Sequence, residues 1–182
     1  MENHLKSILV TEEQIDEITT RLAKEITEDY KNSEKLVLVC ILKGSLMFTT
    51  ELMKKIPLNT LEVEFMKVSS YGSGTTSTGV LNIHLDMKRE DLSDADFLIV
   101  EDIIDSGNTL SRLVKYLKER GANSVKTCAL LDKPDRRAVD FNTDYTGAVI
   151  PDEFVVGFGL DYDEKYRNLP YVGVLDPKVY SN

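Results

Sequence analysis

The sequence lacks several features that define other classes of protein. No window approaches the ~18 apolar residues that a membrane-spanning helix needs, and residues 1–6 show no basic start leading into a long apolar stretch. Basic residues are outnumbered, with 22 against 31 acidic ones, so the formal net charge is -9. Because a nucleic-acid backbone requires a basic surface, this charge argues against RNA or DNA as the main partner. We expect a protein that associates with neither a membrane nor nucleic acid.

Cysteine and histidine are also scarce. Cys40 and Cys128 both lie in apolar, strand-like stretches, where a free thiol behaves as a small hydrophobic residue. This usage suits a reducing compartment, and we expect a cytoplasmic location. His4 and His84 show no spacing typical of a catalytic or metal site. We assign neither of them a catalytic role.

The order of apolar patterns predicts the fold class. With 182 residues, the chain fits a single domain with an ample core. Strand and helix signals alternate through the middle of the chain, which predicts an α/β fold: an open, mainly parallel sheet with helices on both faces. The expected helices are 11–32, the stretch from Ser45 to Lys55, and 107–120. The expected strands are 36–42, 61–68, 80–85, 97–100, 125–131, 154–160 and 171–175.

The most informative segment of the chain is Phe97–Thr109. A short apolar run suited to a buried strand meets the acids Glu101 and Asp102, and a small polar turn then opens a helix. Backbone N–H groups, hydroxyls and the positive helix end at such a turn favour binding of one anion. The two carboxylates can accept hydrogen bonds from sugar hydroxyls, provided that the strand ends there, because neighbouring strand side chains point in opposite directions. The pattern therefore predicts a ligand with a phosphate beside a diol.

This segment resembles the phosphoribosyl pyrophosphate signature of the type I phosphoribosyltransferases, and residues 100–107 are most similar to the hypoxanthine-guanine branch. A Walker A loop needs Gly, four residues, Gly, Lys and Ser or Thr, which this turn lacks, and the spaced glycines of a dinucleotide fingerprint are also missing. The simpler alternative is an acidic loop that only caps a helix. The resemblance extends from about Ile8 to Leu175. It implies a small hood formed by the N-terminal segment and by residues after about 134, and a homo-oligomer, either a dimer or a tetramer.

The resemblance also implies the activity. Such an enzyme transfers the 5-phosphoribosyl group from phosphoribosyl pyrophosphate to a purine base, here hypoxanthine and guanine, and releases pyrophosphate in purine salvage. It implies Mg²⁺ as cofactor, held near Glu101, Asp102 and Asp161, since acids and phosphates otherwise repel one another. The phosphoribosyl group is assigned to Glu101, Asp102, Ser106, Gly107, Asn108 and Thr109.

The pyrophosphate group is assigned to two loops and an arginine: Lys43, Gly44, Ser70, Tyr71 and Arg167. In relatives, the bond that corresponds to Leu42–Lys43 is a cis peptide, and the loop that corresponds to 69–79 closes over the reacting centre. Simpler readings stay open for both loops. Ser45 suits a helix N-cap, and 69–79 suits an ordinary connection between two strands.

The resemblance implies that four residues contact the base, in the following roles. Asp105 exchanges a proton with the imidazole ring of the purine, and Lys133 donates to its 6-oxo group. An ammonium only donates hydrogen bonds, so this pocket favours 6-oxopurines over adenine. Phe154 stacks on the base, and the backbone of Val155 fixes its edge.

Three other functions compete with this one. A relative that prefers xanthine differs only in details of the base pocket. A nucleotide-sensing, RNA-binding regulator shares the fold and the signature but should carry a basic face, which the charge of -9 opposes. A sugar-phosphate-binding module without catalysis does not require Asp105, Tyr71 and Arg167 together.

Overall fold

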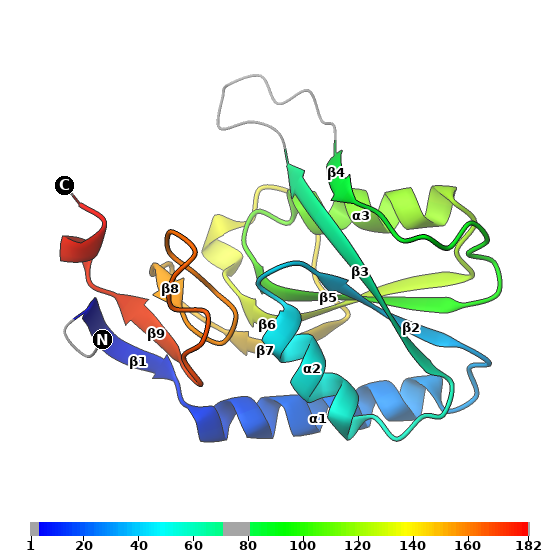
Figure 1. The fold of residues 1–182 in the computed structure, drawn as a ribbon, viewed down its shortest axis with the longest axis horizontal. Coiled ribbons are helices and arrows are strands. Elements are labelled where there is room, and N and C mark those ends of the chain that lie inside the picture. Colours follow the sequence, from blue (N-terminus) through cyan, green and yellow to red (C-terminus); the bar gives the residue numbers. More distant parts are fainter. Residues whose placement is uncertain (1–3, 71–80, 182) are drawn as a thin grey trace.

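A six-stranded sheet forms the centre of the molecule (Figure 1). The computed structural model describes residues 4–70 and 81–181, and for Ser70 it describes the backbone only. Five strands run parallel, and β4 at one edge is antiparallel to β3. The order across the sheet is β4 (Leu81–Leu85), β3 (Leu61–Ser70), β2 (Leu36–Ile41), β5 (Asp96–Ile104), β6 (Ser124–Asp132) and β7 (Tyr145–Val149).

Helices cover both faces of this sheet, so the predicted fold class is confirmed. Helices α1 (Glu12–Tyr30) and α2 (Leu46–Lys55) bury their apolar sides against one face, and α3 (Asn108–Glu119) covers the other (Figure 1). A capping box starts α1: Gln14 N donates to Thr11 Oγ1, and Thr11 N donates to Gln14 Oε1. In residues 4–70 and 81–181, no helix combines the length and apolarity needed to cross a membrane.

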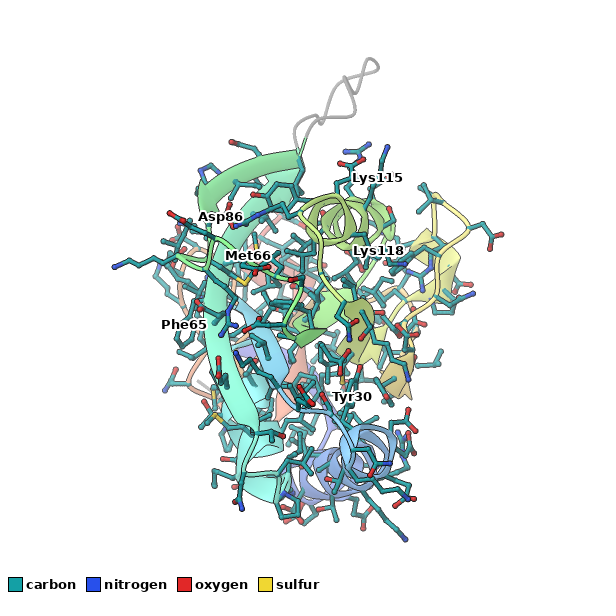
Figure 2. The ribbon with its side chains drawn as sticks, turned by 90° about the vertical axis from the view of Figure 1, so that its right-hand side faces the viewer. Tyr30, Phe65, Met66, Asp86, Lys115 and Lys118 are labelled. Carbon is teal, nitrogen blue, oxygen red and sulfur yellow. The ribbon has the colours of Figure 1, made fainter. Side chains whose placement is uncertain are left out.

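The sheet itself shows the alternation that separates its two faces. Every residue of β2 is buried, as expected for a central parallel strand with helices on both sides. On β3, Met66 points into the molecule and is fully buried, whereas Phe65 points away and is 42% exposed (Figure 2). Leu61 and Val63 share the face of Phe65 and pack against the core under α1 and α2.

A second, three-stranded antiparallel sheet lies beside the carboxyl ends of the parallel strands (Figure 1). It contains β1 (Leu5–Val10), β9 (Val172–Leu175) and β8 (Val155–Val156), in that order. It therefore joins the N-terminal segment to the end of the chain, the two regions expected to form a hood. Short 3-10 helices at Pro134–Arg136 and Pro177–Val179 complete the fold.

Several predicted boundaries were wrong. The strand of the signature does not end at Asp102, because β5 stays paired with β6 to Ile104. The loop expected from Ser69 starts later, since Ser69 and Ser70 still pair with β4. The strand expected at 154–160 is only two residues long, because Gly157 and Phe158 have φ angles of 99° and 47°, which no strand accommodates. The strands β1 and β7 were not predicted at all.

Candidate active site

A cavity of about 350 Å³ lies over the end of β5 and the start of α3. The predicted phosphoribosyl residues Glu101, Asp102, Ser106, Gly107 and Thr109 line it, together with Asp105. Gly107 has φ 79°, the left-handed conformation that turns the chain into the helix, and the first N–H groups of α3 have no helical acceptor. The structure therefore brings together the residues that were predicted to bind an anion. Asn108 begins α3, and its N–H donates to Ser106 Oγ at 3.3 Å; it is not part of the cavity wall.

The two acids at the end of β5 face this cavity as a pair. Burial, reinforced by repulsion from Asp102, raises the pKa of Glu101 well above its usual value. Burial also raises the pKa of Asp102, although its hydrogen bonds with Glu101 and Ile103 N–H and the charge of Arg167 act in the opposite direction. Both carboxylates reach the cavity even though the strand continues past them. Asp105 does not cap α3, because Gly107 occupies the N-cap position without any side-chain bond.

The predicted pyrophosphate loop packs directly on this acid pair. The Leu42–Lys43 peptide bond is cis, as the resemblance implies. A Cβ on Gly44 would lie 1.5 Å from Asp102 Oδ2, and a Cβ on Gly159 would lie 1.9 Å from the Gly44 carbonyl oxygen. Only glycine allows these close approaches. The loop, the end of β5 and the turn at Gly159 thus meet at one point.

Ser45 occupies the N-cap position of α2, as the alternative reading expected, but its side chain does not cap the helix. Its hydroxyl donates to the Ile41 carbonyl at 2.8 Å and also contacts Cys40 Sγ at 3.3 Å, and it makes no capping bond to α2. Ser45 is fully buried. Its side chain therefore fastens the loop to the end of β2 instead of starting the helix.

A second cavity, of about 440 Å³, adjoins the first and contains the predicted base residues. Lys133, Phe154, Val155 and Asp161 line it, and Asp105 belongs to the walls of both cavities. Asp105 Oδ1 is buried without a hydrogen-bond partner among the described residues, and Lys133 Nζ lies 3.9 Å from it. Asp105 is thus placed to act on a group that spans the two cavities.

Phe154 presents a half-exposed aromatic ring to the second cavity. It is 41% exposed, and its ring stacks on Tyr180 with a centroid separation of 5.1 Å. Tyr162 contacts the same ring edge-on at 5.8 Å. Val155 is buried in β8, where it pairs with Val174 of β9. The small sheet therefore supports the ring that was predicted to stack on the base.

Charged side chains fill the space around the pyrophosphate loop. Arg167 pairs with Asp161 at 2.9 Å and with Glu164 at 3.4 Å, and its Nη1 donates to the Gly159 carbonyl at 2.8 Å. Lys43 Nζ donates to Glu164 Oε2 at 2.7 Å. Two predicted pyrophosphate residues, Lys43 and Arg167, therefore share one carboxylate.

Two predicted site residues cannot be placed. Tyr71 lies outside the described residues, and only the backbone of Ser70 is described, at the end of β3. Their assignment to pyrophosphate stays a prediction, as does the closing loop to which they belong.

Comparison with known proteins decides the family. The model of the phosphoribosyl transferase domain matches residues 7–163, most of the chain. The chain belongs to the phosphoribosyltransferase family.

Similar proteins cover this phosphoribosyltransferase from end to end. It is 50% identical to the hypoxanthine-guanine phosphoribosyltransferases of Streptococcus pneumoniae strain R6 and Staphylococcus aureus strain Mu50, covering 100% of this chain and 99% and 100% of those proteins. A crystal structure of a hypoxanthine phosphoribosyltransferase from Staphylococcus aureus superposes with a TM-score of 0.94 and 49% identity, covering 100% of this chain and 97% of that one. The resemblance seen in the signature thus extends over the whole fold.

The sequence analysis missed a buried ion pair of this phosphoribosyltransferase, Arg137 with Asp132, which lies beside the site. Arg137 Nη1 donates to the Asp105 carbonyl oxygen and Nη2 donates to Asp132 Oδ1, both at 2.5 Å, and both side chains of this ion pair are largely buried. The Ala138 N–H also donates to the Ser106 carbonyl at 3.0 Å. The segment after β6 therefore holds in place the turn at residues 105–107, which was predicted to bind phosphate. No motif marks Arg137, since its role depends on a contact across 32 residues.

The acid pair also fits the magnesium that the family implies. Among the described residues, no group of three or more His, Cys, Asp or Glu side chains is arranged to hold a metal alone. Glu101 and Asp102 are instead two adjacent carboxylates whose mutual repulsion calls for a cation. Mg²⁺ takes oxygen ligands and usually completes its shell with substrate phosphates and water. The donor set suits such a shared site.

Proposed function

We propose that this phosphoribosyltransferase transfers the 5-phosphoribosyl group from phosphoribosyl pyrophosphate to hypoxanthine and guanine, giving IMP and GMP and releasing pyrophosphate, as in purine salvage. One observation supports this most directly: Asp105 belongs to both cavities, and Lys133 lies 3.9 Å from its carboxylate. A phosphoribosyl donor in the first cavity and a base in the second would meet at this residue. The names of the full-length relatives agree with this proposal.

The donor would be held at both ends. Its 5-phosphate would accept hydrogen bonds from the turn at Ser106, Gly107 and Thr109, where α3 directs its free N–H groups and positive end. Its ribose hydroxyls would donate to Glu101 and Asp102. The anomeric carbon would then lie near Asp105, which lines both cavities.

Transfer needs one bond to form and one to break. A purine imidazole nitrogen attacks the anomeric carbon, and the bond from that carbon to the pyrophosphate oxygen breaks with its electrons leaving on pyrophosphate. Asp105 accepts the proton that the imidazole ring releases. Lys43 and Arg167 stabilise the charge that develops on the leaving group.

Lys133 would select the base. It is 8% exposed, and its ammonium lies within 4.0 Å of both Asp105 and Asp152. An ammonium can donate to a 6-oxo oxygen but meets the 6-amino group of adenine donor to donor. Phe154 would stack on the ring.

Magnesium would be held by Glu101 and Asp102 together with the donor, and a second ion would lie near Asp161. Bound magnesium would neutralise the negative charge of the pyrophosphate group and of the adjacent carboxylates. We expect calorimetry to detect binding of phosphoribosyl pyrophosphate when Mg²⁺ is supplied and a much weaker signal in the presence of a chelator.

The remaining properties are proposed from the surface and composition. The net charge of -9 supports small-molecule substrates and not nucleic acid, and two buried free cysteines support a cytoplasmic location. Leu46, Met53 and Phe65, on the α2 side of the sheet, are 46%, 37% and 42% exposed, which supports a homo-oligomer formed through this side. Light scattering after gel filtration tests the oligomer, and Phe65→Glu should shift it toward the monomer. We also propose that the chain forms a single domain, with a hood built on the small sheet.

The activity is tested by measuring pyrophosphate release from phosphoribosyl pyrophosphate with each base in turn. Hypoxanthine and guanine should support turnover, and adenine and uracil should not. If xanthine is the best substrate, the protein is instead a xanthine-preferring phosphoribosyltransferase. No release with any base would contradict the proposed function.

A further inference from the structure

The carboxylate of Glu164 lies between the two cations that were assigned to pyrophosphate. Its Oε2 accepts a hydrogen bond from Lys43 Nζ at 2.7 Å, and its Oε1 lies 3.4 Å from Arg167 Nη2. The two cations come from segments more than 120 residues apart in the sequence. One side chain therefore joins the loop after β2 to the turn that follows β8.

The backbone at Glu164 belongs to a tight turn that sets the side chain beside this site. Tyr162 and Lys165 exchange two backbone hydrogen bonds across the turn, at 3.2 and 3.0 Å. Glu164 N also donates to Asp161 Oδ2 at 2.9 Å, and its φ of 61° lies in the left-handed region. The turn is thus fixed by its own bonds, while the Glu164 side chain is 65% exposed.

A carboxylate bound by an ammonium and a guanidinium resembles the contact that a phosphate makes with the same groups. Both are anions whose oxygens accept charge-assisted hydrogen bonds from Lys and Arg. The hydrogen bond from Lys43 lowers the pKa of Glu164, so the group is charged at neutral pH. A pyrophosphate that contacts Lys43 and Arg167 must therefore compete with a charged carboxylate for the same donors.

We propose that Glu164 is an affinity-determining residue of the pyrophosphate subsite, which it occupies with its carboxylate until pyrophosphate or the donor displaces it. The inference rests on the proposed function, because it needs Lys43 and Arg167 to be pyrophosphate ligands. Because the Glu164 carboxylate must first be displaced, both the pyrophosphate group of the donor and the pyrophosphate product bind more weakly. In the free enzyme, the Glu164 carboxylate keeps the two cations paired.

The size of the effect follows from the exposure of Glu164. Exposed ion pairs contribute little, and two of them correspond to about a three- to tenfold change in affinity. Because the Glu164 side chain is exposed, it can turn into solvent when pyrophosphate binds. Its carboxylate therefore reduces the affinity for pyrophosphate without blocking the site.

The test compares Glu164→Gln with Asp163→Asn. Gln keeps the size of the side chain but not its charge, and Asp163 is a matched control because it pairs with Lys165 at 2.8 Å and contacts neither Lys43 nor Arg167. Each variant loses one negative charge, one residue apart. Calorimetry with pyrophosphate and Mg²⁺ gives the Kd, and steady-state kinetics give the KM for phosphoribosyl pyrophosphate.

We expect Glu164→Gln to lower the Kd for pyrophosphate about three- to tenfold, with Asp163→Asn within about twofold of the wild type, since a screened exposed charge acts weakly at a distance. Equal gains in both variants, or no gain in either, would overturn the inference while leaving the enzyme active. A wild-type protein that neither binds nor releases pyrophosphate would instead contradict the proposed function. The two failures are therefore distinguishable.

Discussion

Lys133 Nζ lies 3.9 Å from Asp105 Oδ1, so the residue assigned to the 6-oxo group and the residue assigned to the imidazole proton are neighbours. On its other side Lys133 lies 4.0 Å from Asp152 Oδ1. The ammonium is buried, and no donor among the described residues bonds to Asp105 Oδ1. A base that bonds to Lys133 is thereby brought within reach of Asp105. In the proposed function, this one contact would couple recognition of the base to its deprotonation.

Replacing Asp105 by Asn should lower kcat about a hundred- to a thousandfold, because the amide cannot accept the proton from the purine ring. The Kd for phosphoribosyl pyrophosphate should change only a few-fold, since the amide has the same shape. Rapid-mixing kinetics and calorimetry measure the two quantities. Asp135→Asn, at an exposed acid of the same surface region, is the control and should behave as the wild type. Unchanged turnover in Asp105→Asn would remove the assigned role.

Replacing Lys133 by Met should reduce the catalytic efficiency with hypoxanthine and guanine by about 2 kcal/mol, roughly thirtyfold, since a charged hydrogen bond to the 6-oxo group is lost. The catalytic efficiency with adenine should stay the same or rise. The preference for 6-oxopurines over adenine should therefore decrease. Lys178→Met, at a side chain that is 90% exposed, is the control. If adenine is already the better substrate of the unaltered protein, the assignment of the pocket is wrong.

Some parts of the candidate site could be predicted because their residues are close together in the sequence or match the family. The turn at Ser106 and Gly107 could be predicted because its residues are contiguous and their polarity, size and place after a strand all indicate an anion. Lys133 could be predicted because it follows a strong apolar strand and matches the family. The turn follows from the chemistry of its own residues, whereas the assignment of Lys133 depended on the resemblance to the family.

Other parts depend on contacts that the sequence does not display. Glu164 lies 121 residues from Lys43, and nothing near it distinguishes a site carboxylate from a solvated one. Strand β7 was missed because Thr146 and Gly147 interrupt its apolar pattern, and its pairing with β6 stabilises it instead. Ser45 suited a helix cap by position, but its hydroxyl bonds back to Ile41. For Glu164 and β7 a contact between distant parts of the chain decides the structure, whereas for Ser45 a bond to a residue four positions earlier replaces the capping bond.

Replacing Gly44 by Ala should impair the donor site while leaving the fold intact. The new Cβ would lie 1.5 Å from Asp102 Oδ2, and the Gly159 backbone packs against the Gly44 carbonyl, so the Asp102 side chain must move away from the sugar. Displacement by about 1 Å can cost about a hundredfold in kcat/KM, which kinetics with varied phosphoribosyl pyrophosphate will measure.

Gly121→Ala is the matched comparison for Gly44→Ala. No heavy atom lies within 4 Å of its added Cβ, but its φ of 91° disfavours alanine. It should lose about 1 kcal/mol of stability and keep normal kinetics. A Gly44→Ala protein with wild-type kinetics would show that the loop does not constrain Asp102.

The buried pair of Arg137 and Asp132 should contribute separately to stability and to donor binding. Removing one partner, as in Arg137→Met, leaves a buried charge and should cost about 3 kcal/mol in urea unfolding. Replacing both, as in Arg137→Met with Asp132→Leu, should recover most of that stability, because no buried charge remains. The Asp105 carbonyl has still lost its donor, so the KM for phosphoribosyl pyrophosphate should stay raised about tenfold in the double variant. A double variant with wild-type KM would show that Arg137 stabilises the fold without positioning the phosphate turn.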